Sequence, residues 1–245
     1  VTWTKSFNCS GVVGFDVVRL LKAALKRKMH KSIPYVDVVA IINDTTGTLI
    51  SGALQDKNCL IGLIVGTGCN ACYVERLENI EKWSFNYSDP RQVVINCEWG
   101  PFGDNNVLEF VRTIWDRSLD YESVNQGKQL YEKMISGMYL PELFRRVLLT
   151  LIERGVLFSG HVPLELLRPN SISTKRMSEI DTDANGDDFQ HTRAVLKKLF
   201  KNDEFTDIDV KIVFMINSRI TKRAAYLVAT GLWALVKRIP QCDVS

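Results

Sequence analysis

Asn43 and Asp44 stand at the end of an apolar stretch of the sequence, where polar side chains could meet a ligand. The stretch reads VDVVAII over residues 36–42 and is typical of a buried strand. Ligands collect at the carboxyl ends of strands in α/β sheets, and a carboxylate placed there can act as a general base toward a hydroxyl group. The alternative is an Asx turn or a helix N-cap, in which Asp44 or Thr45 satisfies backbone N–H groups. Taken alone, the local sequence favours this alternative.

A glycine-rich turn, Gly66-Thr67-Gly68, follows the apolar segment CLIGLIV of residues 59–65. Such a turn lets backbone N–H groups approach a phosphate without interference from a Cβ atom, and Thr67 adds a hydroxyl donor. It is not a Walker A loop, because the Gly-Lys-Ser/Thr ending is missing. It is not a dinucleotide-binding fingerprint either, because a strand follows it where that motif opens a helix. Taken alone, the sequence favours a plain hairpin turn.

Three more polar residues, Glu98, Gln129 and Glu132, are candidates for ligand binding. Glu98 follows the strand-like segment QVVINC of residues 92–97, and Gln129 and Glu132 are spaced to share one face of a predicted helix. The alternatives are a surface carboxylate and an intrahelical polar pair. Asn, Asp, Glu and Gln side chains together suit a polyhydroxylated ligand, because each hydroxyl group needs a donor and an acceptor. Beside a phosphate-binding turn, they indicate a sugar and a nucleotide.

The six cysteines are scattered along the chain, which fits a protein of a reducing cytosol and not a disulfide scaffold. Cys69 and Cys72 have the spacing of a redox or metal motif. They fall in a predicted strand, where positions three apart face opposite sides, and no second pair completes a zinc site. A structural role is therefore favoured, and a redox or metal protein stays as an alternative.

The composition is that of an ordinary globular chain. Its 245 residues are 46% hydrophobic and 24% charged, which suits one large domain or two small ones. The net charge of +3 is too small to indicate a nucleic-acid or membrane surface. No apolar run approaches the roughly 20 residues that span a bilayer, and nothing resembles a signal peptide.

The elements expected to position these residues are strands in the first part of the chain and helices after it, which indicates an α/β or α+β fold. The predicted strands are 36–42, 59–65, 70–77, 92–97 and 209–216. The predicted helices are 12–29, 106–119, 126–136, 141–154, 190–201 and 219–238. Residues 46–54 fit either a strand or the start of a helix, residues 164–182 are mixed, and residues 183–188 form a polar loop.

The order of these motifs resembles that of the eukaryotic hexokinase/glucokinase family. The segments that carry the resemblance are TWTKSF (2–7), VVAIINDTTGTL (38–49), GLIVGTGCNACYVE (62–75), INCEWGPFGDN (95–105), DRSLD (116–120), NQGKQLYEKMISGMYLPEL (125–143) and RRVLL (145–149). GVLFSG (155–160), STKRMSEI (173–180) and RITKRAAYL (219–227) continue it more loosely.

The resemblance implies an α/β fold of the actin-like ATPase (ribonuclease H-like) hexokinase type. Residues 1–40 would be the C-terminal part of the small domain, and residues 41–245 would be an incomplete large domain. Most of the chain would therefore belong to the large domain. The implied activity is phosphorylation of glucose or a related hexose at the 6-hydroxyl in the cytoplasm, with ATP and Mg²⁺, as in glycolysis. No nucleic-acid partner and no membrane association are implied.

The resemblance also implies a role for individual residues. Asp44 would be the catalytic base. The hexose would be bound by Thr4, Lys5, Asn43, Asn70, Glu98, Gln129 and Glu132. Gly66, Thr67 and Gly68 match the second phosphate-binding loop of the family, and Thr174 and Ser178 match positions near the nucleotide. No residue is assigned to a metal ion.

Some family features are missing from this sequence. An earlier glycine-rich loop with an aspartate and a Ser-Phe-Pro sugar segment would precede residue 1, and an adenosine-contacting Gly-Asp-Gly motif would follow residue 245. Ser6 replaces a usual glycine, and residues 83–91 diverge as an expected surface loop. We therefore expect the chain to be a central fragment that phosphorylates glucose very poorly or not at all. The alternative is a non-catalytic sugar-binding or regulatory relative.

Overall fold

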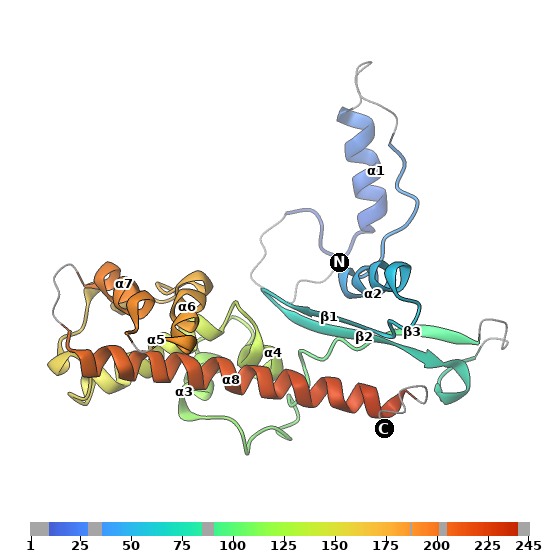
Figure 1. Ribbon diagram of the computed structural model, residues 1–245. Coiled ribbons are helices and arrows are strands. Elements are labelled where there is room, and N and C mark those ends of the chain that lie inside the picture. Colours follow the sequence, from blue (N-terminus) through green and yellow to red (C-terminus); the bar gives the residue numbers. More distant parts are fainter. Residues whose placement is uncertain (1–9, 29–35, 85–90, 187, 201–204, 240–245) are drawn as a thin grey trace.

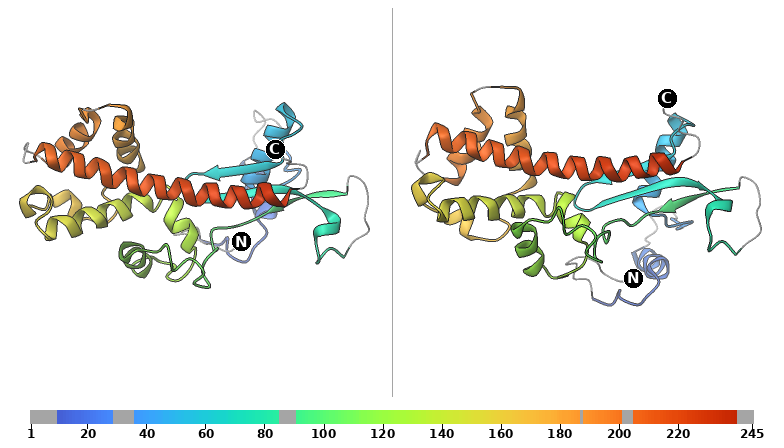
Figure 2. Two further views of the ribbon diagram at one scale, coloured as in Figure 1. Left: turned by 60° about the horizontal axis from the view of Figure 1, so that its bottom comes forward. Right: turned by 90° about the horizontal axis from the view of Figure 1, so that it is seen from below.

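A three-stranded sheet lies toward one end of the molecule and a group of helices toward the other, and one long helix, α8 (Asp207–Arg238), runs along both (Figure 1). The turned views show the same division (Figure 2). The computed structural model describes residues 10–28, 36–84, 91–186, 188–200 and 205–239. Below, the "sheet end" means α2, the three strands and the loop 97–112, and the "helical end" means α5, α6, α7 and the first half of α8.

The sheet is antiparallel, with its strands in the order β1-β2-β3. Its strands are β1 (Ile61–Val65), β2 (Cys69–Arg76) and β3 (Gln92–Asn96). Val65 pairs with Cys69 across the tight turn of residues 66–68, and Cys72 pairs with Asn96 on the other side of β2. The three strands predicted in this part of the chain are therefore confirmed, and so is the hairpin at the glycine-rich turn.

Helix α2 (Asp44–Gln55) packs closely on one face of the sheet, which settles residues 46–54 as helix. The close approach depends on Gly62, because a Cβ atom there would lie 2.7 Å from the carbonyl oxygen of Thr45. The Sγ of Cys72 donates to the same carbonyl oxygen at 3.2 Å. The next residue of β2 faces the opposite side, where the Tyr73 hydroxyl accepts a hydrogen bond from Arg238 at the end of α8.

The buried strand predicted for residues 36–42 is wrong. This segment has no regular secondary structure and pairs with no other strand among the residues that the structure describes, and Val39 is 92% exposed. A strand needs a partner for its backbone hydrogen bonds, and apolar composition alone supplies none. The helix predicted for residues 12–29 is confirmed as the shorter α1 (Val17–Lys28), which buries none of its residues. It contacts residues 36–42 through the ion pair of Lys22 and Asp37.

Two helices in the middle of the chain are shorter than predicted. They are α3 (Ile114–Tyr121) and α4 (Leu130–Ile135). Residues before α3 form a series of turns that includes Asn106 in the left-handed region, and the helix begins where Thr113 and Asp116 form a capping box. Before α4, Gly127 and Gln129 are left-handed, with φ of 71° and 58°, which excludes a continuous helix from residue 126.

The helical end contains the larger apolar core. It is built from α5 (Leu140–Glu153), α6 (Thr174–Asp181), α7 (Gln190–Leu199) and the first half of α8. Phe144, Ile152 and Leu196 are each at most 1% exposed. Helices α5 and α7 lie close to the bounds that their apolar periodicity predicts. Short 3₁₀ segments cover Leu77–Asn79, Phe158–Gly160, Leu164–Leu167 and Thr182–Asn185.

The strand predicted for residues 209–216 is also wrong, because these residues belong to α8. Thr206 and Asp209 form a capping box that starts the helix before the β-branched run. Val210, Val213 and Asn217 are then buried at helical spacing against the helical end. Capping and packing therefore override the strand propensity of this segment. The helix predicted for residues 219–238 is confirmed as the rest of α8.

Candidate functional site

A cavity of about 600 Å³ opens beside the sheet, where α2, the β1–β2 turn, the loop after β3 and the start of α4 meet. It brings together most of the site residues predicted from the sequence. Its lining includes Asn43, Asp44, Thr67, Gly68, Asn70, Glu98, Gln129 and Glu132, together with Ile64, Cys69 and Gly100. These residues come from segments almost 90 residues apart in the chain, from Asn43 to Glu132, yet they line one cavity.

Asn43 is both a helix cap and a cavity residue. Its Oδ1 accepts from the backbone N–H groups of Thr45 and Thr46 at 2.9 and 3.4 Å, as the N-cap of α2. Its Nδ2 faces the other way and donates to Glu98 Oε1 at 3.4 Å. Asp44 is the exposed first residue of α2, where the helix dipole favours a negative charge. The predicted N-cap is therefore present, but it is Asn43 and not Asp44 or Thr45, and the same geometry places Asp44 at the cavity.

Glu98 accepts amide hydrogen bonds from three asparagines. Its Oε1 lies 2.8 Å from Asn96 Nδ2 and 3.1 Å from Asn70 Nδ2, in addition to the contact with Asn43. Glu98 has a φ of 46°, in the left-handed region that is strained for a residue other than glycine. Strain of this kind clusters at functional sites, so the conformation of Glu98 supports a binding role.

Glu132 is buried in α4 and reaches the sheet. Its Oε2 accepts the backbone N–H of Cys69 at 3.1 Å, and its own N–H donates to the carbonyl oxygen of Gly100 at 3.2 Å. Gly100 also makes room for Gln129, because a Cβ atom at residue 100 would overlap Gln129 Oε1 and lie 3.3 Å from its Cδ. Gln129 itself sits just before α4 as its N-cap.

The glycine-rich turn contacts two further segments. The carbonyl oxygen of Gly66 accepts the N–H of Gly137 at 2.8 Å, and the Thr174 hydroxyl donates to the carbonyl oxygen of Gly137 at 2.7 Å. A Cβ atom on Gly66 would meet no atom within 4 Å, so the turn is open on that side. Thr174 begins α6 and Ser178 lies exposed one turn later. The structure thus brings Thr174 next to the turn, although neither Thr174 nor Ser178 lines the cavity.

Sequence reasoning missed three residues that support the site, namely Asn96, Asp104 and Gly137. Asn96 Oδ1 accepts from Asn70 Nδ2 at 2.7 Å, so that it orients a cavity residue. Asp104 accepts two backbone N–H groups at the start of α4. The run of polar residues around Glu98 was a signal for the first two, whereas the contact of Gly137 with the β1–β2 turn depends on tertiary structure alone.

Two predicted site residues are not tested, and the cysteine pair shows no reactive thiol. Thr4 and Lys5 lie outside the described residues. Cys69 and Cys72 are buried free thiols on opposite faces of β2. Burial raises the pKa of both thiols, which keeps them protonated and unreactive. Among the residues that the structure describes, no group of three or more His, Cys, Asp or Glu side chains could hold a metal ion.

Comparison with known proteins gives consistent matches. A family model described as hexokinase matches residues 60–245, and a second model with the same description matches residues 1–54. Hexokinase-1 from Homo sapiens is 44% identical over 240 residues, which are 98% of this chain and 25% of that protein. Hexokinase from Schistosoma mansoni is 40% identical over 246 residues, which are 100% of this chain and 53% of that protein.

Solved structures give the same result. The structure of hexokinase from Schistosoma mansoni complexed with glucose superposes with a TM-score of 0.87 at 40% identity, covering 98% of this chain and 52% of that one. A second hexokinase crystal structure superposes with a TM-score of 0.76 at 30% identity. The predicted α/β fold of the actin-like ATPase type is thereby confirmed. Within the described part of the chain, no helix is long and apolar enough to cross a bilayer.

Proposed function

This chain belongs to the hexokinase family, and on that premise we propose that it carries the hexose-binding and proton-accepting residues of an ATP-dependent hexose kinase. The chain spans about a quarter of the mammalian relatives and about half of the Schistosoma mansoni relative that it matches. The observation that carries the proposal is the polar cavity beside the sheet. A similar protein of known structure was solved with glucose, which supports a hexose as the ligand.

The cavity has the chemistry that a hexose requires. Carboxylates at Glu98 and Glu132 accept hydrogen bonds from sugar hydroxyl groups, and the amides of Asn70 and Gln129 both donate and accept. The bonds among Glu98, Asn70 and Asn43 hold these groups in place before a ligand arrives. A preorganised polar cavity of this kind binds a polyhydroxylated molecule with little loss of side-chain entropy. We extend the same role to Thr4 and Lys5, which precede the described residues.

Asp44 is the proposed general base. It would accept the proton of the hexose 6-hydroxyl as that oxygen attacks the γ-phosphorus of ATP and the bond to the ADP leaving group breaks. Its position at the first residue of α2, at the edge of the cavity, leaves it exposed to a ligand hydroxyl. Its Oδ1 accepts the backbone N–H of Thr45 at 2.8 Å, which orients the carboxylate. Phosphoryl transfer depends mainly on positioning and on electrostatic stabilisation, so an oriented base suits the reaction.

The glycine-rich turn and the start of α6 are the proposed phosphate-binding elements. The open side of Gly66 and the exposed hydroxyl of Thr67 fit phosphate oxygens, and Gly68 completes the turn. The Thr174 hydroxyl lies beside the turn and donates to the carbonyl oxygen of Gly137, a bond that it would exchange for one to a phosphate oxygen. Ser178 lies one turn further along α6. Mg²⁺ supplies neutralisation of phosphate charge when it is bound, and we propose that it enters with the nucleotide, as it often does in kinases.

We also propose the domain boundary that the resemblance to the hexokinase family implies. Residues 1–40 would belong to the small domain and residues 41–245 to the large domain. The support is that α1 buries none of its residues, whereas α2 packs on the sheet.

The proposed function predicts that the chain binds D-glucose in isothermal titration calorimetry. Asn70→Ala should raise the dissociation constant for glucose by about tenfold, because it removes hydrogen bonds to the ligand and to Glu98. Asp44→Asn should bind glucose nearly as well as the unchanged chain. In a form of the protein that phosphorylates glucose, Asp44→Asn should lower kcat by about 10²–10⁴, as expected for the loss of a general base.

Two results would contradict these proposals separately. The absence of any glucose binding by the folded chain would remove the hexose site. A near-normal kcat of Asp44→Asn in a coupled glucose-6-phosphate assay would remove Asp44 from the role of base but leave the hexose site intact.

A further inference from the structure

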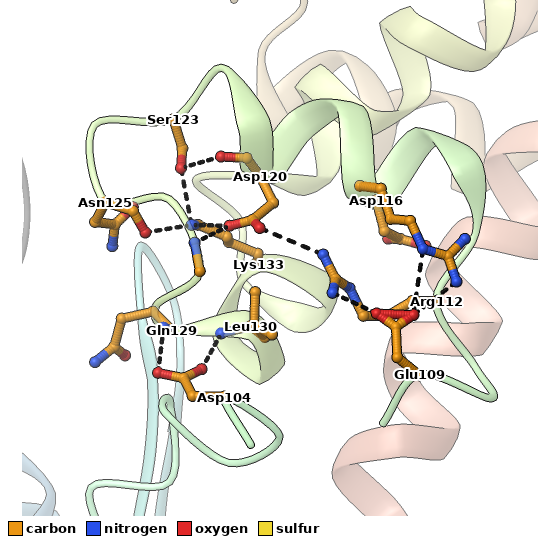
Figure 3. A network of polar contacts seen from close by, with 12 residues as sticks. Asp104, Glu109, Arg112, Asp116, Asp120, Ser123, Asn125, Gln129, Leu130 and Lys133 are labelled. Carbon is orange, nitrogen blue, oxygen red and sulfur yellow. Dashed lines mark hydrogen bonds and ion pairs between the residues drawn. The ribbon is translucent and has the colours of Figure 1, made fainter. Parts of the chain in front are cut away.

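The start of α4 has an unusual cap. Gln129 is the N-cap residue, is left-handed with φ 58° and ψ 39°, and makes no side-chain cap hydrogen bond. Asp104 makes the cap in its place. Its Oδ2 accepts the N–H of Gln129 at 3.1 Å and its Oδ1 accepts the N–H of Leu130 at 3.0 Å (Figure 3). A carboxylate that lies 25 residues earlier in the chain thus satisfies two backbone donors at the end of the helix.

The consequence concerns the side chain of Gln129. An N-cap side chain ordinarily bonds to backbone N–H groups of its own helix, which points it along the helix. Because Asp104 takes over that function, the carboxamide of Gln129 is available to line the cavity. A left-handed backbone is costly for glutamine, so a partner such as Asp104 must hold it there. Gly100, in the same loop as Asp104, leaves the space that the carboxamide fills.

A second group of contacts anchors the other side of this segment. Lys133 is 3% exposed, and its Nζ donates to Asp120 Oδ1 at 2.7 Å, to Ser123 Oγ at 2.8 Å and to the carbonyl oxygen of Asn125 at 2.9 Å (Figure 3). All three N–H groups of the ammonium are therefore bonded. The chain that leads into α4 is fixed at both ends, by Lys133 on one side and by Asp104 next to the cavity.

We propose that Asp104 is a positioning residue for the hexose site. It holds the backbone of Gln129 and the first turn of α4 in the one conformation that presents Gln129 and Glu132 to the ligand. Asp104 does not itself line the cavity, so it acts through these two residues. The inference rests on the proposed function, because it assumes that the cavity binds a hexose.

The helical end offers a matched control. Asp183 accepts the N–H groups of His191 and Thr192 at 3.1 and 2.7 Å near the start of α7. The N-cap of α7 is Phe189, which is also left-handed and also makes no side-chain cap bond. Asp104 and Asp183 are therefore both carboxylates that cap a helix from outside it, Asp104 at the N-cap and first residue of α4 and Asp183 at the second and third residues of α7, but no residue of α7 lines the cavity. A purely structural role for Asp104 predicts that Asp104→Asn and Asp183→Asn behave alike.

The test is calorimetric titration of D-glucose into the unchanged chain, Asp104→Asn and Asp183→Asn. Asparagine replaces one of the two carboxylate oxygens by an NH₂ donor, which cannot accept the N–H group that this oxygen accepted. We expect Asp104→Asn to weaken glucose binding by about tenfold and Asp183→Asn by less than about twofold. Thermal unfolding followed by circular dichroism shows whether both variants are folded. Equal glucose affinity in Asp104→Asn and the unchanged chain would overturn the proposal.

A double variant tests whether Asp104 acts through Gln129. In a Gln129→Ala background, Asp104→Asn should weaken glucose binding by much less than in the unchanged chain, because part of what it positions is already gone. If the losses of glucose affinity caused by Asp104→Asn and Gln129→Ala were fully additive, Asp104 would not act through Gln129.

Amide hydrogen exchange gives a readout that needs no ligand. Asp104→Asn should speed exchange of the Gln129 and Leu130 amides, and Asp183→Asn should leave them unchanged. If the unchanged chain binds no glucose, the proposed function fails on its own. In that case, unaltered exchange in Asp104→Asn would also overturn the ordering role, and faster exchange would support it.

Discussion

The helical end and the sheet end are held together by different interactions. At the helical end, Phe144, Leu148 and Ile152 of α5 are at most 1% exposed and pack in one large apolar cluster with α6, α7 and α8. At the sheet end, large apolar side chains such as Leu54 of α2 and Phe110 of the loop 97–112 are exposed. The cavity there is organised by hydrogen bonds between polar groups from different loops.

The difference separates what stabilises the fold from what shapes the site. Apolar burial has little directional preference and tolerates small shifts, whereas hydrogen bonds fix donors and acceptors to within tenths of an ångström. Glu98 and Gln129 at the cavity have a left-handed backbone, but so does Phe189 at the helical end, so hydrogen bonding and not backbone conformation distinguishes the cavity. Changes at the helical end should therefore alter the free energy of unfolding, and changes at the cavity should alter ligand affinity.

The largest expected effect is on the core of the helical end. Phe144→Ala should lower the free energy of unfolding by about 3–5 kcal/mol, because it removes a buried aromatic ring and leaves a cavity. Urea titration followed by circular dichroism measures the loss. If the two ends are as separate as proposed, the fraction that stays folded will bind glucose with unchanged affinity. A large change in the affinity of the folded protein would mean that the helical end also shapes the site.

A change at Gly62 should affect both properties. A Cβ atom there would lie 2.7 Å from the Thr45 carbonyl oxygen and 2.9 Å from Leu49 Cβ, so Gly62→Ala must push α2 away from the sheet. We expect a loss of about 2 kcal/mol in the free energy of unfolding, together with weaker glucose binding because Asn43 moves. Both are measured by urea titration and calorimetry.

Gly47→Ala is the control for Gly62→Ala. Gly47 lies on α2, the helix that packs against Gly62 of β1, and a Cβ atom there would make an ordinary contact of 3.5 Å with Ile42 Cδ1. Alanine is the better helix former, so this variant should be slightly more stable than the unchanged chain. Equal stability of Gly62→Ala and Gly47→Ala would show that the packing of α2 is looser than the distances indicate.

The smallest expected effect is a pH dependence at the helical end. Burial alone would raise the pKa of Asp183, but the hydroxyl and backbone N–H of Thr192 and the N–H of His191 more than offset this, and the pKa is lowered. Because the folded-state pKa lies below the unfolded value near 4, the stabilisation is complete above about pH 4 and is lost as the pH falls through the folded-state pKa.

Asp183→Asn should therefore cost about 1 kcal/mol of stability at pH 7, as is typical for a lost helix cap. The difference from the unchanged chain should shrink as the pH is lowered below 4, in urea titrations at a series of pH values. A difference that stays constant down to pH 2 would contradict the assignment. Asp183→Asn should bind glucose at pH 7 with the affinity of the unchanged chain. That result would show more sharply that the helical end and the cavity are separate.

The fold was predictable from the sequence where local signals and burial agree. Helix α5 has Pro141 in its first turn and a clear apolar face, and the β1–β2 hairpin has strand-forming segments on both sides of a glycine-rich turn. The two strands that were predicted wrongly both have strand-like composition, but they differ in the structure that they adopt. Residues 36–42 find no pairing partner among the described residues, and residues 209–216 are drawn into α8 by the cap at Thr206 and by packing against the helical end.

The site was predictable only in part, for a physical reason. The residues that point into the cavity have side-chain types suited to a sugar, and their order along the chain matches a known family. The residues that hold them, such as Asn96 and Asp104, have the same composition as any polar loop. Their role depends on which backbone N–H or amide group lies opposite, and only the folded chain determines that.

Helix α8 also has a consequence for how the chain folds. It joins residues far apart in the sequence: Tyr131 bonds to Leu227 over 96 residues, Asp116 to Arg223 over 107 and Glu75 to Arg238 over 163. Closing loops of that size costs more entropy than forming the hairpin, so these contacts form late. During synthesis, the face of the sheet that carries Tyr73 and Glu75 therefore waits for Arg238, at the end of α8, before these contacts can form. Until then, that face is a region of transient exposure on which chaperones could act.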